Sequence, residues 1–146
     1  MKLSTKSRYG VRMMADLADH YGRDPVFLKD IAKREEISEK YLSIIVIPLR
    51  SAGLIKSTRG AHGGYLLAQS PAETTLRSIL DALGEKICLV DCIKNLRSCS
   101  RAGTCSTRDV WSVLSEKIRE TLDSITLADL VQTRRKKAAD NIMNNI

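Results

Sequence analysis

The sequence predicts a mainly α-helical fold with a small β wing: a winged helix-turn-helix followed by a long C-terminal dimerisation helix. Three observations predict this fold. Apolar residues recur at helical spacing in successive short segments, a glycine-rich hairpin follows the third segment, and a long apolar stripe lies near the C-terminus. With 146 residues, of which 43% are hydrophobic and 28% charged, the chain is suited to a single folded core.

The first two predicted helices are short and adjacent. A helical pattern begins near Tyr9, and Gly22 is expected to end it. Asp24-Pro25 is typical of a turn, and residues 28–34 then show a second helical pattern before two glutamates. Two short helices in succession indicate a compact corner.

The third predicted helix begins after Ser38, whose hydroxyl can accept a hydrogen bond from a free amide of the first turn. It is expected to reach residues 50–52, with a kink or a tightened last turn at Pro48. Gly53 is expected to adopt the left-handed conformation that ends such a helix.

A hairpin follows, with extended residues 54–58 and 65–67 joined by a glycine-rich tip that contains Arg59 and His62. This order of elements is typical of a winged helix-turn-helix. In such modules the third helix enters the major groove of DNA, and an arginine of the wing can enter the minor groove. The residues predicted to contact DNA are Ser38, Tyr41, Ser43, Ile44, Thr58 and Arg59.

The charge of the chain favours a polyanionic partner, since the net charge is +7. Residues 1–67 hold 12 basic and 7 acidic residues, whereas residues 68–146 hold 12 and 10. The alternatives are a solvated basic surface and a hairpin without a ligand. A single-strand binder is disfavoured by an aromatic content of 4%, and a nucleotide-binding loop by the lack of Lys-Ser/Thr after the glycines. Duplex DNA is the favoured partner.

Four cysteines, Cys88, Cys92, Cys99 and Cys105, lie in the segment after the hairpin, and no pair has the two-residue gap of a zinc ribbon or thioredoxin motif. Without a secretory signal the thiols are expected in a reducing compartment, which disfavours disulfides. Residues 93–108 include four cations and no carboxylate, which favours thiolates and hence reactive or metal-bound cysteines. The alternative is that Cys88 packs as a small apolar residue and the other thiols are merely exposed.

The C-terminal half is predicted to mediate assembly. An apolar stripe at helical spacing consists of Trp111, Leu114, Ile118, Leu122 and Ile125. An intramolecular core is one interpretation, but the N-terminal module is small, so a homodimer with a pseudo-palindromic DNA site is favoured. Residues 126–129 resemble a capping box that starts a short helix, and residues 134–146 are expected to form a flexible basic tail.

The predicted organisation has four parts. A winged helix-turn-helix occupies residues 1–70, and a connecting helix capped by Thr75 with the cysteine loop occupies 71–107. Dimerisation helices occupy 108–133, and the basic tail 134–146.

Four stretches of the chain resemble one family of winged-helix regulators, and together they are highly specific. They are Leu3-Ser4-Thr5-Lys6-Ser7-Arg8-Tyr9-Gly10, Ile37-Ser38-Glu39-Lys40-Tyr41-Leu42, Pro48-Leu49-Arg50-Ser51-Ala52-Gly53-Leu54 and Arg59-Gly60-Ala61-His62-Gly63-Gly64-Tyr65. The chain is similar here to the family that includes the iron-sulfur cluster assembly repressor IscR, the nitric oxide sensor NsrR and the cysteine regulator CymR. The resemblance extends from residue 1 to about residue 130.

The resemblance implies a 2Fe-2S cluster held by Cys92, Cys99 and Cys105, because cluster-binding members carry three cysteines in this loop. Where IscR-like members have a histidine after the last cysteine, this chain has Arg108, which remains protonated and cannot ligate iron. The fourth ligand stays open among Cys88, a carboxylate such as that of Asp91, a residue of the partner subunit, and a small molecule. A second difference is that Ser43-Ile44 replaces the usual Glu-Gln of the recognition helix, so Ile44 can contact a thymine methyl group but cannot form a bidentate contact to adenine.

The resulting hypothesis is a homodimeric, cytoplasmic transcription repressor that is controlled by the cluster and regulates iron-sulfur cluster assembly genes. The alternatives are a repressor that senses nitric oxide or thiol oxidation, and a metal-free regulator of cysteine metabolism that acts through a partner enzyme. A thiol enzyme is disfavoured because the chain has no Cys-x-x-Cys pair and because neither His20 nor His62 has an evident cysteine partner. No sequence segment is apolar enough to span a membrane.

Overall fold

A computed structural model describes residues 2–146. Its elements are α1 (Thr5–Asp19), α2 (Leu28–Glu35), α3 (Glu39–Ser51), β1 (Ile55–Thr58), β2 (Gly64–Leu67), α4 (Leu76–Ala82), two short 3₁₀ turns η1 (Asp91–Ile93) and η2 (Leu96–Ser98), α5 (Ser106–Ser124) and α6 (Leu127–Asn144). This order confirms the predicted mainly helical fold with a small wing. Within the described part of the chain, no helix is long and apolar enough to cross a membrane.

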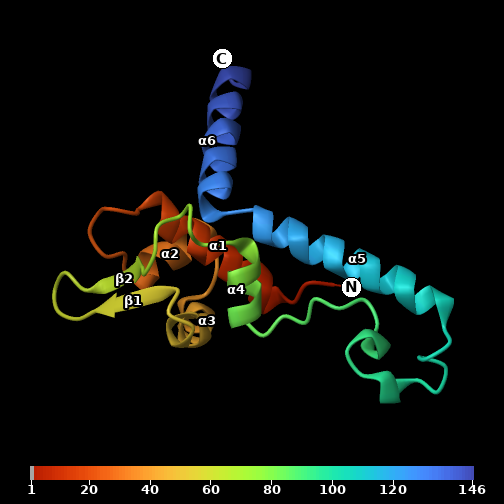
Figure 1. The fold of residues 1–146 in the computed structure, drawn as a ribbon. Helices are drawn as coiled ribbons and strands as arrows, with labels where there is room; N and C mark the ends of the chain where they lie inside the picture. The colour runs from red at the N-terminus through yellow and green to blue at the C-terminus, as the bar shows by residue number, and fades with distance from the viewer. Residues whose placement is uncertain (1) are drawn as a thin grey trace.

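Helix α1 forms the centre of the folded core, with α2, α3, α4 and the start of α6 packed around it (Figure 1). Met13 and Met14 of α1 are completely buried. They share one apolar cluster with Ile31 of α2, Leu42 of α3 and Leu127 of α6. Because residues far apart in the chain fill this cluster, the C-terminal helix is anchored on the helix-turn-helix.

Helix α1 begins earlier than the sequence predicts. The apolar pattern starts near Tyr9, whereas the first helical residue is Thr5. Ser4 is the N-cap, and its hydroxyl accepts a hydrogen bond from the backbone N–H of Ser7 at 3.1 Å. A polar first turn carries no apolar signal, so the capping bond rather than the periodicity sets this boundary.

Helix α3 has the predicted boundaries. Ser38 caps its start, and Gly53, with φ +74°, follows its end. The backbone N–H of Leu54 donates to the carbonyl of Leu49, and that of Gly53 donates to the carbonyl of Arg50. These two bonds form a Schellman motif, which a left-handed glycine permits. The helix continues past Pro48 to Ser51, and bending at Pro48 stays a prediction.

The wing is an antiparallel hairpin in which Ile55 pairs with Leu67 and Thr58 with Gly64. An isolated bridge between Val26 and Tyr65 joins the hairpin to the segment before α2. Gly64 has φ +141°, and a Cβ atom on it would lie 2.5 Å from the carbonyl oxygen of Val26. A side chain at this position would therefore displace the hairpin from the helices.

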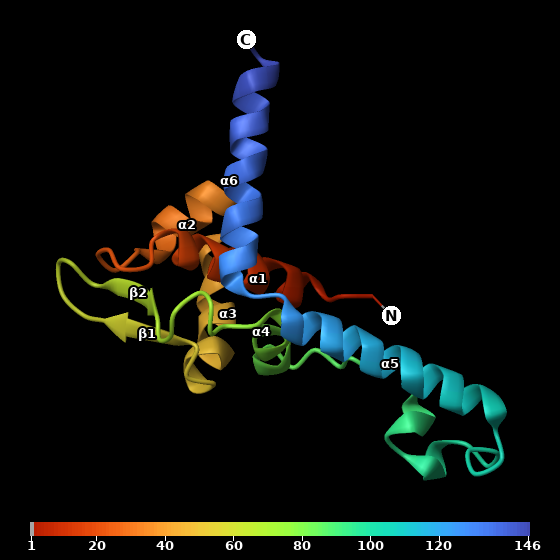
Figure 2. The same cartoon turned by 45° about the horizontal axis from the view of Figure 1, so that its top comes forward.

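The last two helices project from this core in different directions (Figures 1 and 2). The cysteine-containing loop lies at the far end of α5, away from the hairpin. Helix α6 rises on the side of the molecule opposite α3. The prediction of a short helix after Thr126 was wrong, because α6 continues to Asn144. Most of the expected tail is thus helical, and the flexibility of residues 134–146 stays a prediction. The predicted capping box is confirmed by reciprocal bonds between Thr126 and Asp129.

Candidate nucleic-acid interface and cysteine loop

Helix α3 presents one buried and one exposed face. Leu42, Ile45 and Leu49 are completely buried in the core, which fixes the rotation of the helix. The opposite face, here called the outer face of α3, is exposed and consists of Lys40, Ser43, Ile44, Ile47 and Arg50. Its residues follow one another at helical spacing, so the whole stripe can lie against a flat or grooved partner.

The structure gives the predicted α3 residues different roles. The hydroxyl of Ser38 accepts from the N–H of Tyr41 at 3.1 Å, and the hydroxyl of Ser43 donates to the carbonyl of Lys40 at 2.6 Å. The ring of Tyr41 is half-buried and packs edge-on against Tyr9 at a centroid distance of 5.7 Å. Ile44 is 52% exposed. Tyr41 thus also positions α3 on α1, whereas Ser43 and Ile44 face outward.

The predicted wing residues lie at the tip of the hairpin. Thr58 ends β1 and its hydroxyl donates to the carbonyl of Gly64 at 3.5 Å, and Arg59 follows with an exposed side chain. Strand β1 packs against α3, so the hairpin projects beside the recognition helix (Figure 1). A third helix with a neighbouring wing arginine is the arrangement that contacts both grooves of DNA.

Three residues of the outer face were not predicted from the sequence: Lys40, Ile47 and Arg50. Ile47 is 58% exposed, although it ends an aliphatic run that resembles core sequence. Its spacing from Ile44 and Lys40 is the signal that could have placed it outward.

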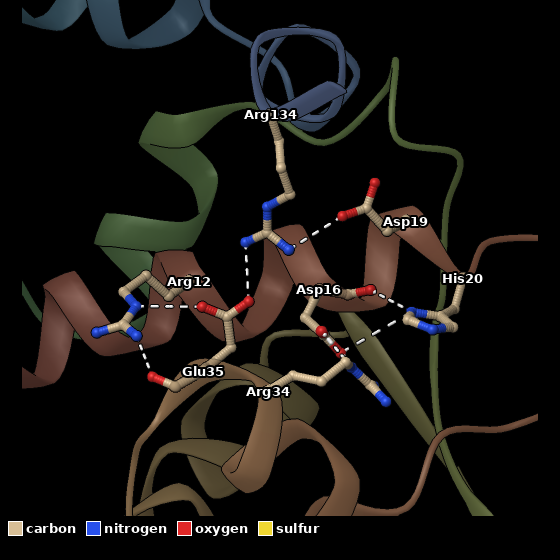
Figure 3. A network of polar contacts seen from close by, with 7 residues as sticks. All are labelled: Arg12, Asp16, Asp19, His20, Arg34, Glu35 and Arg134. Carbon is tan, nitrogen blue, oxygen red and sulfur yellow. Dashed lines mark hydrogen bonds and ion pairs between the residues drawn. The ribbon is translucent and has the colours of Figure 1, made fainter. Parts of the chain in front are cut away.

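A polar network fixes the position of α2 beneath α1 (Figure 3). Asp16 of α1 is 1% exposed, and its carboxylate accepts from Arg34 Nε at 2.8 Å and from Arg34 Nη2 at 2.7 Å. The hydrogen bonds that Arg34 donates to the Asp16 carboxylate are the main cause that raises the pKa of the Arg34 guanidinium. Nδ1 of His20 lies 2.8 Å from the carbonyl oxygen of Asp16. His20 is therefore a helix-end residue that belongs to this network. It is far from every cysteine in the sequence.

Glu35 connects three helices in the same network (Figure 3). Its carboxylate accepts from Arg12 Nε of α1 at 3.2 Å and from Arg134 Nη2 of α6 at 2.8 Å. Arg134 also donates from Nη1 to Asp19 at 3.0 Å. The first residue of the predicted flexible tail is thus tied to the helix-turn-helix by two ion pairs.

The cysteine loop brings the backbone of Cys92 close to the start of α5. Arg108 Nε donates to the carbonyl of Cys92 at 3.0 Å, and Cys105 is the N-cap of α5. Cys99 is exposed, and the other cysteines are half-buried. Among residues 2–146, no group of three His, Cys, Asp or Glu side chains is close enough to hold a metal ion. The three predicted ligands share one loop but are not gathered.

The thiol of Cys105 lies at the start of α5, beside hydrogen-bonding groups and cations. A hydrogen bond with the Thr107 hydroxyl, at 3.1 Å, lowers the pKa of its thiol. The backbone of Arg108 and Thr107 and the charge of Arg101 act in the same direction. A lower thiol pKa favours the thiolate, which is both the nucleophile and the metal ligand.

Glu85 links the start of the cysteine segment to α1. Its carboxylate accepts from the Ser4 hydroxyl at 2.7 Å, from the Ser4 N–H at 3.2 Å, and from the Ser7 hydroxyl. The hydrogen bond from Ser7 is the main cause that lowers the pKa of Glu85. The negative charge of a carboxylate at this position is also stabilised by the positive end of the α1 helix dipole. These bonds hold the start of the cysteine segment against the N-terminal end of α1.

The sequence model of the Rrf2 family, described as an iron-dependent transcriptional regulator, matches residues 3–133. The chain belongs to this family. It is 43% identical to the protein rrf2 of Nitratidesulfovibrio vulgaris over 132 residues, which cover 90% of this chain and 88% of that protein. Family members of this kind are named as transcriptional regulators rather than enzymes.

Two solved structures place the fold in the same family. The CymR global cysteine regulator of Bacillus subtilis matches with a TM-score of 0.78 and 41% identity, over 91% of this chain and 98% of that chain. IscR of T. potens matches with a TM-score of 0.75 and 42% identity, over 92% and 88% of the two chains. The predicted resemblance to IscR-like regulators is confirmed, and the chain is a DNA-binding regulator of this family.

Proposed function

We propose that this Rrf2-family chain is a homodimeric repressor that binds a pseudo-palindromic operator and is controlled by a 2Fe-2S cluster. The observation that carries the proposal is the pairing of an exposed recognition face on α3 with a cation-rich cysteine loop at the start of α5. The genes proposed as targets are those of iron-sulfur cluster assembly.

DNA contact is assigned to the outer face of α3 and to the wing. In this proposal Ser43 and Ile44 face the major groove. Ser38 and Tyr41 hold the start of α3 against the DNA backbone. Thr58 and Arg59 approach the minor groove. Lys40 and Arg50 stand at the two ends of the outer face, where phosphates flank the groove. Binding should weaken with rising salt, because each neutralised phosphate releases counterions.

Dimer formation is assigned to α5. An apolar groove along this helix is lined by Leu89, Leu114, Lys117, Ile118, Thr121 and Leu122. Both Leu114 and Trp111 belong to the predicted apolar stripe, and in the single chain they are 43% and 39% exposed. A second copy covering this stripe would place two α3 helices on one face of DNA.

The cysteine loop fits a cluster in its chemistry but needs to rearrange. Cys92, Cys99 and Cys105 are soft thiolate donors of the kind that hold iron-sulfur clusters, and the cations of residues 93–108 offset the negative charge. When bound, the cluster would supply a redox-active group whose presence depends on iron supply. The hydrogen bond with Thr107 favours the Cys105 thiolate, and Arg108 holds the backbone of Cys92 near the start of α5. Because Arg108 cannot ligate iron, the fourth ligand is Cys88, Asp91, a partner residue or a small molecule.

Coupling between loop and DNA is assigned to Glu85. Its hydrogen bonds to Ser4 and Ser7 connect the cysteine segment to α1, which in turn carries α3. A coupling free energy of about 1–3 kcal/mol is sufficient to change operator occupancy severalfold.

The test is anaerobic reconstitution with iron and sulfide, followed by measurement of iron, sulfide and visible absorption. We expect two irons and two sulfides per cluster, and loss of both in the Cys92→Ser, Cys99→Ser and Cys105→Ser variants. Operator affinity of the holo and apo forms should differ. A colourless, iron-free protein that binds DNA equally well with and without iron would contradict the cluster while leaving the DNA-binding regulator intact.

A metal-free thiol sensor is the second candidate, and the lowered pKa of Cys105 favours it. In that case oxidation of Cys105, or binding of a partner enzyme as in the cysteine-metabolism branch, would change DNA affinity without iron. A sensor of nitric oxide acting on the cluster is the remaining alternative. Titration of DNA affinity with peroxide in the presence of an iron chelator distinguishes the metal-free candidate from both cluster-based ones.

A further inference from the structure

Two branched aliphatic side chains stand exposed on the outer face of α3. Ile44 is 52% exposed and Ile47 58% exposed, and three positions separate them, so they are neighbours on the helix surface. The buried face of the same helix is already filled by Leu42, Ile45 and Leu49. Ile44 and Ile47 therefore contribute nothing to the core of this chain and form a small apolar surface at the middle of the recognition helix.

The surroundings of this pair indicate what covers it. Lys40 lies one turn before Ile44 and Arg50 lies one turn after Ile47, both exposed on the same face. Arg59 lies on the adjacent wing. An apolar centre between cations matches the major groove of DNA, where phosphates form the edges and the thymine 5-methyl group is the apolar group on the floor.

The polar side chain between these groups, Ser43, keeps only its acceptor capacity for a base, because its proton is already engaged. Ser43 directs its hydroxyl proton to the carbonyl of Lys40, within its own helix. Isoleucine has no donor or acceptor, so the bidentate contacts that identify guanine or adenine are not available from positions 44 and 47. Any specificity that positions 44 and 47 supply must come from shape and from apolar contact.

We infer that Ile44 and Ile47 select thymine in each half-site, by packing against the 5-methyl groups of neighbouring thymines in the major groove. The inference rests on the proposed function and specifies the bases that this protein prefers. It assigns Ile47 a role in specificity and predicts that the operator differs at these positions from sites that are read by hydrogen-bonding side chains.

The experiment uses the full-length protein. Duplexes retained from a random pool give the operator, and binding constants are then measured at one salt concentration. Each thymine of one half-site is replaced in turn by deoxyuridine, which lacks only the 5-methyl group. We expect affinity to fall about fourfold at one or two neighbouring positions, the factor for leaving one methyl group unburied. Replacement at other thymines should have no effect.

Side-chain variants assign the contact. In Ile44→Ala and Ile47→Ala, affinity for the thymine operator should fall, and the additional penalty for deoxyuridine at the matching position should disappear. Both side chains are exposed, so the fold should be retained, which thermal unfolding checks. The control is Ile142→Ala on α6, where the side chain is 65% exposed on the side of the molecule opposite α3. It should keep the full deoxyuridine penalty.

The outcomes separate this inference from the proposed function. Tight operator binding that is insensitive to every deoxyuridine overturns the inference and leaves the regulator intact. A deoxyuridine penalty that persists in both isoleucine variants also overturns it. Loss of self-association in these variants instead of loss of DNA affinity would show that a second copy covers this face. If no duplex is retained from the pool, the proposed function fails and the inference fails with it.

Discussion

Asp16 is the most deeply buried carboxylate of the polar network, and its partner Arg34 remains 40% exposed. This asymmetry determines the cost of breaking the pair. Removing the Asp16 carboxylate lets Arg34 turn toward water, whereas removing Arg34 leaves the buried Asp16 carboxylate without this charged partner. We expect Asp16→Asn to reduce the free energy of unfolding by about 1–3 kcal/mol, below the loss for a pair that is buried on both sides. Urea denaturation measures it.

The control for this prediction is Asp81→Asn. Asp81 pairs with Arg77 at 3.5 Å, but its side chain is 58% exposed. The change should cost less than about 0.5 kcal/mol, as for other exposed pairs. Equal losses of unfolding free energy in the two variants would show that burial of Asp16 does not determine the effect.

At Cys105, the neighbouring hydroxyl sets the reactivity of the thiol. The hydrogen bond with Thr107 is the main cause of the lowered pKa, so removing it should raise that pKa and reduce the thiolate fraction at neutral pH. We expect Thr107→Val to shift the pH profile of Cys105 alkylation by iodoacetamide to higher pH. Mass spectrometry of the Cys105 peptide follows the rate. Thr104→Val, an exposed change one position before Cys105, is the control. An unchanged profile in Thr107→Val would contradict the assignment.

Among the elements, α6 depends on a single side chain for part of its attachment. Arg134 joins it to Asp19 of α1 and to Glu35 of α2, in addition to the buried Leu127 and Val131. We expect Arg134→Gln to speed amide hydrogen exchange along α6 and to lower stability by about 1–2 kcal/mol, because Glu35 is only 10% exposed and loses a charged partner. Hydrogen exchange with mass spectrometry measures the first effect and urea denaturation the second.

The adjacent Arg135→Gln is the matched control for α6. Arg135 is exposed and carries the same charge and nearly the same helix propensity. Its replacement should change neither exchange nor stability measurably. If both variants behave alike, the helix is held by its apolar contacts and the ion pairs of Arg134 are incidental.

The elements that the sequence predicts well are those with local signals. In α3, the cap at Ser38 and the glycine at position 53 are visible in the sequence and define both ends. The length of α6 was not predictable in this way. Its attachment through Arg134 involves residues about a hundred positions away, and its distal half has no apolar stripe against the core. No periodic apolar signal therefore marks how far α6 extends.

The residues of the candidate site also differ in whether local sequence signals determine their placement. Ser43, Ile44 and Arg59 are exposed, as contact with DNA requires, and that contact stays a prediction. Ile47 was missed since an aliphatic residue is normally assigned to the core. For Cys92, Cys99 and Cys105 the sequence gives donors and spacing, but loop conformation decides whether three sulfur atoms meet. Spacing cannot specify that conformation, because η1 and η2 are irregular turns held by short-range bonds.

The apolar core is formed by α1, α2, α3, α4 and the start of α6, whereas much of α5 is exposed. Val110, Trp111, Val113 and Leu114 are each at least 39% exposed on this helix. A long helix with so much exposed apolar surface is more stable when a partner covers it. Burial of apolar surface contributes about 25 cal/mol of stabilising free energy per Å². The apolar groove at Leu114 shares Ile118 and Leu122 with a second apolar pocket, which is lined by residues of α1, α4 and α5. A second copy seated there would couple the two DNA-binding modules.

Replacing Leu114 by aspartate tests this assembly directly. The charge would lie in the centre of the α5 groove, where covering it by a second copy would leave a carboxylate without a partner, so we expect the dimer to dissociate. Analytical ultracentrifugation should show the monomer mass, and affinity for a palindromic operator should fall at least a hundredfold while a single half-site is bound as before. Ser112→Asp adds the same charge to an exposed position outside the groove and should leave the dimer intact. A Leu114→Asp protein that still sediments as a dimer would place the contact elsewhere on the molecule.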